Sequence, residues 1–383
     1  MTTQSDNQAD TDVGLIWGFA NERTHFVIGG NYFERKALYT RDRDFAEYPL
    51  PDFTPFFRPT DFPVVSGDIP FLLDSNCTQA GGFRDTAFGG LCYGSFSPSR
   101  DIFSEEERKQ LMATWTHDLN DGHTIYGEIG WSDTGIPALG NSPSLPVTLF
   151  MPFTADNPGA QAEMAAQGIP ADAIQSLMFW GVTRNNEENL NSPFGRVESS
   201  YLYESRRIVI GSEGELAAGW RYDASYNYSS NQYELKSRDT LTSRLSDALN
   251  GYGMCDRNAP GAAPGVGDCR WFNPFGNSIL AAPGSALYND PALTQWMDND
   301  VIVNGDSSLA VWDFIATQDS LFEVPAGAVG LAVGAQYRDA KVRSDPDERV
   351  QEGQFVFSSV NTPYSGSQDV WAVFAELAIP VAD

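Results

Sequence analysis

The stretch Gln110-Leu-Met-Ala-Thr-Trp-Thr-His-Asp-Leu-Asn-Asp-Gly-His-Thr-Ile-Tyr-Gly-Glu-Ile-Gly-Trp131 decides the fold of this chain. Apolar and polar residues alternate on both sides of Asn120-Asp121-Gly122, which is the period-2 pattern of a β-hairpin. A three-residue loop sets Leu119 opposite His123 and gives both strands one common apolar face. That face carries Leu111, Trp115, Ile125, Ile129 and Trp131, whereas the opposite face carries Thr114, Thr116, Tyr126 and Glu128.

Three more stretches repeat this hairpin pattern. The predicted strands are 13–20 with 25–33, 206–216 with 220–230, and 310–324 with 329–337, followed by a ninth strand at 369–380. Short turns such as Ala217-Ala218-Gly219 and Pro325-Ala326-Gly327-Ala328 join the two strands of each pair. Long segments separate the pairs, at about 40–101, 136–199, 237–307 and 343–367, and the second of these contains one predicted helix at 160–167.

This regular alternation of short and long connections predicts an outer-membrane β-barrel. Such barrels have short periplasmic turns, long extracellular loops, a lipid-facing apolar surface and a polar lumen. A soluble β-sandwich has no reason to place all its short turns at one end. Nine strands would leave two free edges, and unpaired backbone groups in hydrocarbon are costly. The sequence therefore predicts an all-β fold, a partial antiparallel transmembrane barrel that forms part of a larger one.

Composition and charge narrow the class of partner. The 383 residues are 42% hydrophobic and 13% aromatic, which excludes bulk disorder and suits aromatic girdles at membrane interfaces. The net charge of -27 argues against a nucleic-acid partner. Residues 1–12 lack the basic and apolar regions of a signal peptide, and we expect this segment to be disordered and residues 13–383 to form the barrel fragment.

The four cysteines form two local pairs, Cys77 with Cys92 and Cys255 with Cys269. Each pair would close a loop of about fifteen residues, for which a disulfide contributes roughly 3 kcal/mol. No Cys-x-x-Cys motif and no histidine lies near either pair, so the spacing favours two disulfides over a metal site. Disulfides indicate an oxidising compartment.

Two motifs resemble the barrel region of TonB-dependent outer-membrane receptors. They are Cys269-Arg-Trp-Phe-Asn-Pro-Phe-Gly276 in a cysteine-bridged loop and the strand Asp369-Val-Trp-Ala-Val-Phe-Ala-Glu-Leu-Ala-Ile-Pro380. The resemblance implies a barrel of about 22 strands in the outer membrane of a Gram-negative bacterium. It also implies a plug domain, a small-molecule ligand, energy from TonB, and contact with outer-membrane lipid. No plug-like sequence, TonB box or terminal aromatic strand is found, and no cofactor or enzymatic activity is expected.

Several residues are candidates for ligand contact. The predicted lumen-facing candidates are Glu128, Arg221, Asp223, Arg338 and Asp339, although polar groups in a water-filled interior have the same pattern. Aromatic residues of the long loops are candidates for stacking on a ligand, or else they pack the loops together, which is the interpretation we favour. They are Phe53, Phe56, Phe57, Phe62, Phe150, Phe153, Trp271, Phe272 and Phe275.

Two possible metal sites have simpler explanations. His117 and His123 are predicted to be diagonal neighbours, but a position among interfacial aromatic residues suits them better. Asp345, Asp347 and Glu348 could bind Ca²⁺, but acidic runs are commonly solvated loops. His25 is the third histidine of the chain. All three lie at predicted strand ends and do not suggest a catalytic triad. The alternatives for function are a passive porin-like channel and a secreted disulfide-bearing β-sandwich that binds carbohydrate.

Overall fold

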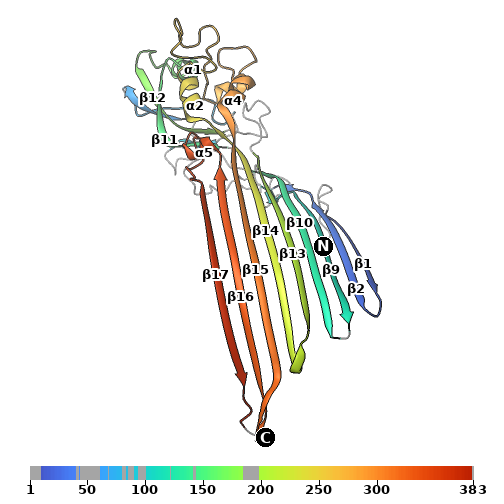
Figure 1. The fold of residues 1–383 in the computed structure, drawn as a ribbon. Coiled ribbons are helices and arrows are strands. Elements are labelled where there is room, and N and C mark those ends of the chain that lie inside the picture. Colours follow the sequence, from blue (N-terminus) through green and yellow to red (C-terminus); the bar gives the residue numbers. More distant parts are fainter. Residues whose placement is uncertain are drawn as a thin grey trace.

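The computed structural model describes residues 10–39, 43, 61–67, 69–79, 83–84, 90–93, 101–120, 122–140, 144–183 and 198–381. One large antiparallel sheet dominates it, and the long connections gather at one end of that sheet (Figure 1). Among the described residues, no helix is long and apolar enough to span a membrane.

The large sheet contains nine strands in the order β1-β2-β9-β10-β13-β14-β15-β16-β17. They are β1 (Asp10–Ala20), β2 (Thr24–Arg35), β9 (Glu106–Asn120), β10 (His123–Gly140), β13 (Glu198–Glu215), β14 (Trp220–Thr240), β15 (Asp298–Val324), β16 (Gly327–Pro346) and β17 (Tyr364–Ala378). Each strand lies beside the next long strand along the chain, so the sheet is an antiparallel meander. The prediction of nine such strands is confirmed.

The register of the hairpin around residue 121 agrees with the prediction. Trp115 pairs with Gly127 and Leu111 with Trp131, so the predicted apolar residues of β9 and β10 share one face. At the tip the register shifts and His123 pairs with Asn120, so Leu119 is not opposite His123 as expected. A bulge at a hairpin end accommodates this one-residue change without reversing the faces.

The other short turns lie at the same end of the sheet (Figure 1). The 3₁₀ turn η4 (Ala217–Gly219) joins β13 to β14, and both Ala218 and Gly219 have positive φ angles, 62° and 76°. Glycine reaches this region without strain, whereas alanine does so at a cost. Two residues, Pro325 and Ala326, join β15 to β16, fewer than the four predicted.

The long connections fold into a cap with its own secondary structure. A four-stranded sheet has the order β11-β12-β4-β5, and two small sheets pair β3 with β8 and β6 with β7. The cap strands are β3 (Leu38–Tyr39), β4 (Phe62–Gly67), β5 (Phe71–Leu72), β6 (Phe83–Arg84), β7 (Cys92–Tyr93), β8 (Asp101–Phe103), β11 (Ser144–Thr154) and β12 (Ile174–Thr183). Its helices are α1 (Pro158–Ala166), α2 (Thr242–Leu249), α3 (Asn277–Leu280), α4 (Pro291–Met297) and α5 (Glu348–Gln351).

The cap contains the main apolar core of the described residues. This core combines residues from four different connections, for example Phe62, Phe153, Leu249 and Val356. The Phe62 ring lies edge-on to Phe153 and Phe275, with centroid distances of 5.6 and 4.8 Å. Segments distant in sequence thus bury one another's aromatic surface, and this burial holds the loops in a defined arrangement.

Several predicted boundaries are wrong. Strand β1 begins at Asp10, and residues 10–12 pair with Phe33–Arg35 instead of being disordered, while residues 1–9 lie outside the described residues. Strands β14, β15 and β16 are much longer than predicted, so the third long loop spans 241–297 rather than 237–307. These extensions carry polar residues on both faces, so no apolar alternation marks them. The helix predicted at 160–167 is present as α1.

Candidate functional site

A row of mainly aromatic and apolar residues crosses the whole sheet on one face. Directly paired residues of antiparallel strands lie on the same face, so the register can be followed from strand to strand. The row is Phe19, Phe26, Trp115, Gly127, Ile210, Tyr226, Trp312, Tyr337 and Trp371. We call the face that carries this row the aromatic face. Within the described residues no second sheet covers it, and Trp371 is 75% exposed.

The apolar band on the aromatic face has the height of a bilayer core. Along β14 it extends from Trp220 to Tyr228, and Ser230 and Gln232 follow on the same face. Nine residues at about 3.3 Å each give roughly 30 Å along the strand. A strand tilt of about 40° reduces this to roughly 23 Å, close to the ~25 Å band of outer-membrane barrels.

The band also runs obliquely across the strands. The distance from the aromatic row to the end of the strand on the short-turn side differs between the two edge strands. Phe19 is followed by one further residue of β1, whereas Trp371 is followed by seven further residues of β17. On β9 the aromatic face is still apolar at Leu111, whereas on β16 its first charged residue is Asp339. Asp339 lies one cross-strand row nearer the short turns than Leu111. An oblique band is expected when tilted strands cross a flat apolar layer, because tilt staggers neighbouring strands.

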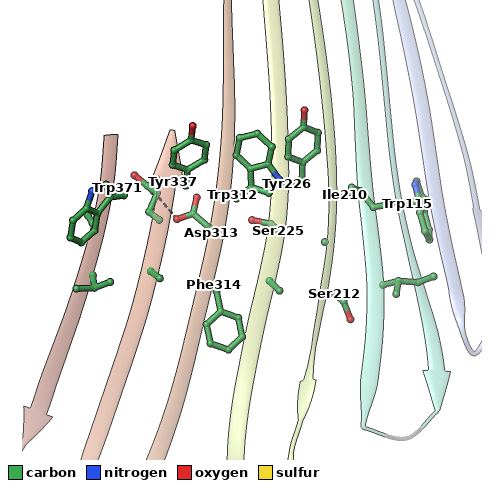
Figure 2. A pocket seen from close by; sticks show the side chains of 17 residues that line it. Trp115, Ile210, Ser212, Ser225, Tyr226, Trp312, Asp313, Phe314, Tyr337 and Trp371 are labelled. Carbon is green, nitrogen blue, oxygen red and sulfur yellow. Dashed lines mark hydrogen bonds between the residues drawn. The ribbon is translucent and has the colours of Figure 1, made fainter. Parts of the chain in front are cut away.

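A hollow of about 790 Å³ lies on the aromatic face beneath the aromatic row. Figure 2 shows the rings of Tyr226, Trp312, Tyr337 and Trp371 side by side on four strands. The small residues Ser212, Ala224 and Ala335, one row below, leave the space open. Its lining is mostly apolar, as expected of a surface that contacts hydrocarbon.

The opposite face, here called the polar face, carries charged and hydrogen-bonding groups. Arg207 Nη1 lies 3.4 Å from Glu128 Oε1, and the Tyr126 hydroxyl donates to Asp223 Oδ1 over 2.7 Å. Gln336 Nε2 donates to Asp313 Oδ1 over 2.6 Å. Sequence reasoning missed Arg207, Asp313 and Gln336, although extending the strand alternation by a few residues would have identified them.

Four of the five predicted lumen candidates lie on the polar face. Glu128, Arg221, Asp223 and Arg338 alternate with residues of the aromatic face. Asp339 does not, because consecutive strand residues point to opposite sides. It pairs with Asp369, shares the aromatic face with Tyr337 and accepts a hydrogen bond from Lys341 Nζ over 3.1 Å. The five candidates therefore do not share one face as predicted, and a ligand path along the four on the polar face stays a prediction.

Most of the loop aromatic candidates that can be placed belong to the cap core. Phe62, Phe153, Phe272 and Phe275 are each at most 1% exposed, so they pack the loops together and cannot stack on a ligand. Trp271 is partly exposed and lies against Gly251 and Gly265, where a larger residue would overlap its ring. Phe53, Phe56, Phe57 and the side chain of Phe150 lie outside the described residues.

Both predicted disulfides are present in the cap. The Cα atoms of Cys77 and Cys92 are 5.8 Å apart, and those of Cys255 and Cys269 are 4.9 Å apart. The first disulfide lies beside a half-buried ion pair, because the Asp61 carboxylate accepts hydrogen bonds from Cys92 N and Arg84 Nη1, both at 2.7 Å. The hydrogen bond to Asp61 raises the pKa of the Arg84 guanidinium, so Arg84 stays charged over the physiological range.

Asp61→Asn is expected to lower the free energy of unfolding of the cap by about 1–3 kcal/mol. The amide keeps one acceptor oxygen but loses the charge that Arg84 requires, and the partial exposure of Arg84 limits the cost. Urea unfolding with the disulfides intact measures this change. The exposed Asp172→Asn serves as the control, and equal midpoints for the two variants would show that Asp61 contributes nothing.

The possible metal sites have ordinary hydrogen-bond partners. His117 Nδ1 lies 2.9 Å from Thr24 Oγ1, and His123 Nδ1 lies 3.3 Å from the Tyr222 hydroxyl. Asp347 caps α5 and accepts from the backbone N–H groups of Ile302, Arg349 and Val350. Among the described residues, no group of three or more metal-binding side chains converges.

Comparisons with known proteins give alignments with solved receptors. The ferric enterobactin receptor of Pseudomonas aeruginosa aligns with 97% of this chain at 12% identity and a TM-score of 0.40. The ferric preacinetobactin receptor of Acinetobacter baumannii aligns with 100% at 10% identity and a TM-score of 0.36. The chain covers 34% and 39% of these two receptors. No family model and no curated protein matches it.

Proposed function

We propose that this chain forms part of the barrel wall of a TonB-dependent outer-membrane receptor, which takes up a scarce small-molecule ligand. The observation that carries this proposal is the oblique apolar band on the aromatic face, which has bilayer height and crosses all nine strands. The polar face then lines a water-filled interior, and the short turns lie in the periplasm. The outer membrane of a Gram-negative bacterium is the membrane that contains such barrels.

The two edges of the sheet support a larger barrel. Strands β1 and β17 each pair with one neighbour among the described strands, and both cross the apolar band. A free strand edge in hydrocarbon leaves N–H and C=O groups without partners, at several kcal/mol each. We therefore propose that further antiparallel strands cover both edges in the complete protein. The plug and the partnership with TonB belong to the same proposal and rest on the sequence resemblance.

The arrangement of the cap suits a receptor. Strands β14 to β16 continue for many residues beyond the apolar band and end in the cap (Figure 1). Its loops share one buried core, so they form a defined surface above the barrel opening rather than independent flexible arms. A ligand such as a siderophore, cobalamin or a carbohydrate would meet this surface first.

Site-directed spin labelling along β14 tests the membrane assignment. Single labels at successive positions from 222 to 229, in full-length protein in lipid vesicles, should show oxygen accessibility that alternates with period two. Labels at Tyr222, Ala224, Tyr226 and Tyr228 should contact lipid, and those between them should contact water-soluble nickel reagents. Water accessibility on both faces would refute the membrane assignment.

Conductance distinguishes a receptor from a passive channel. The full-length protein in a planar bilayer should pass little ionic current, because a plug closes the lumen of a receptor. A steady open conductance without ligand would instead support the porin-like alternative. The spin-label result is independent of this outcome, since both classes expose the same aromatic face to lipid.

A further inference from the structure

The polar face contains a second hollow, of about 770 Å³, which spans β1, β2, β9, β10, β13 and β14. Glycines create the depression, because Gly14, Gly29 and Gly130 contribute no side chain to this face. The volume lies within the range of pockets for small ligands.

Neutral hydrogen-bonding side chains form one continuous row through this hollow. Strand register aligns Asn31, Gln110, Ser132, Ser205, Asn231 and Ser307 as successive neighbours on six strands, and all of them except Ser307 line the hollow. All six are amides or hydroxyls, in a chain whose net charge is -27. The Ser205 hydroxyl donates to the amide oxygen of Asn231, which leaves the amide nitrogen of Asn231 available as a donor to a ligand.

The charged groups near the row are already paired. Arg207 lines the hollow but lies 3.4 Å from Glu128, and Arg206 belongs to the aromatic face, where it binds Glu204. At the β1 edge of the sheet, the Asp12 carboxylate is paired as well, because Asn31 Nδ2 donates to Asp12 Oδ1 over 2.6 Å. A ligand in this hollow would therefore meet hydroxyls, amides and the exposed apolar side chains of Ile16 and Met112, but no unpaired charge.

Two tyrosine rings border the row on the side toward the cap. On the polar face, Tyr203 of β13 is the next residue from Ser205 toward the cap. Tyr233 of β14 is likewise the next residue from Asn231, and the two tyrosines are paired. Their ring centroids are 6.3 Å apart, and Tyr203 is 47% exposed. Gly305 pairs with Tyr233, and any side chain there would overlap the ring, so the glycine lets Tyr233 lie across β15. The rings thus form a platform beside the row of neutral groups.

We infer that this hollow binds a neutral polyhydroxylated ligand, a saccharide. Sugar hydroxyls donate and accept hydrogen bonds, as amides and serine hydroxyls require, and the C–H face of a sugar ring packs on an aromatic ring. An anionic ligand would lack a free cation there, and an apolar ligand would leave the amides without partners. The inference rests on the proposed function, because it requires the polar face to line a water-filled interior.

Binding of defined trisaccharides to the full-length protein in detergent tests this inference. The probes are maltotriose, cellotriose and xylotriose, with trigalacturonate as the charged control, in calorimetric titrations. At least one neutral probe should bind, and trigalacturonate should bind more weakly. Tyr203→Ala should weaken binding about three- to tenfold, whereas Tyr203→Phe should retain it, because stacking needs the ring and not the hydroxyl.

Variants on the two faces make the result specific to this site. Asn231→Ala should weaken binding, and Tyr228→Ala, on the aromatic face of the same strand, should leave it unchanged. Equal effects of Tyr203→Ala and Tyr228→Ala would overturn the site. Binding of an iron complex but of no neutral saccharide would overturn the ligand class while leaving the receptor proposal intact. The spin-label and conductance measurements decide whether that proposal fails.

Discussion

Ile125→Arg is expected to destabilise the membrane-inserted protein by about 2–4 kcal/mol, the cost of a cationic side chain near the middle of the bilayer on the lipid face. Ile125 lies on the aromatic face, two residues from the aromatic row and beside the apolar hollow. The guanidinium would have to reach the interface or draw water into the hydrocarbon. Unfolding in guanidinium chloride from lipid vesicles, followed by tryptophan fluorescence, measures the change.

Thr124→Arg is the matched control for this prediction. Thr124 is the preceding residue of β10 and lies on the polar face, where its hydroxyl donates to Asp118 over 2.7 Å. An arginine there can reach water and the Asp118 carboxylate, so we expect a change of about 1 kcal/mol or less. If the two variants lose equal stability, the aromatic face does not contact lipid.

Phe62→Ala is expected to lower the free energy of unfolding of the cap by about 3–5 kcal/mol. Phe62 is 0% exposed and lies at the centre of the cap core, in contact with the Phe153, Phe179 and Phe275 rings. Its removal leaves a cavity between elements from different loops. Urea unfolding followed by limited proteolysis of the cap detects the loss.

Phe357→Ala serves as the control, because Phe357 is 56% exposed and lies outside this core. Its removal should change stability by less than about 0.5 kcal/mol. If the Phe62→Ala and Phe357→Ala variants unfold at the same urea concentration, the cap core contributes no stability. A cap that unfolds while the β14 accessibility pattern persists would show that the cap and the sheet are separately stable.

The sequence alone predicted the sheet because strand alternation is a local signal. Trp115 pairs with Gly127 as expected, and Trp17 and Phe19 share a face with Ile28 and Phe26. A one-residue slip would reverse an entire strand, so each hairpin contains enough information to define its own register. The cysteine spacing was equally local, and both disulfides formed as predicted.

Local patterns failed where residues distant in sequence determine the environment. For Phe153 and Phe272 the sequence left ligand contact open and favoured packing, and both are buried because segments more than a hundred residues apart pack together. Asp339 is a separate, local case, because strand alternation alone places it on the opposite face from Arg338.

The amino-acid sequence by itself determined the strands, their pairing within each hairpin and the division into an aromatic and a polar face, since each depends on neighbours along the chain or on one short turn. Only the tertiary structure decided how the rows of different hairpins align. The register between β2 and β9, and between β10 and β13, joins segments that long connections separate. This alignment creates both the oblique apolar band and the row from Asn31 to Ser307, because cross-strand neighbours exist only once the strands have paired.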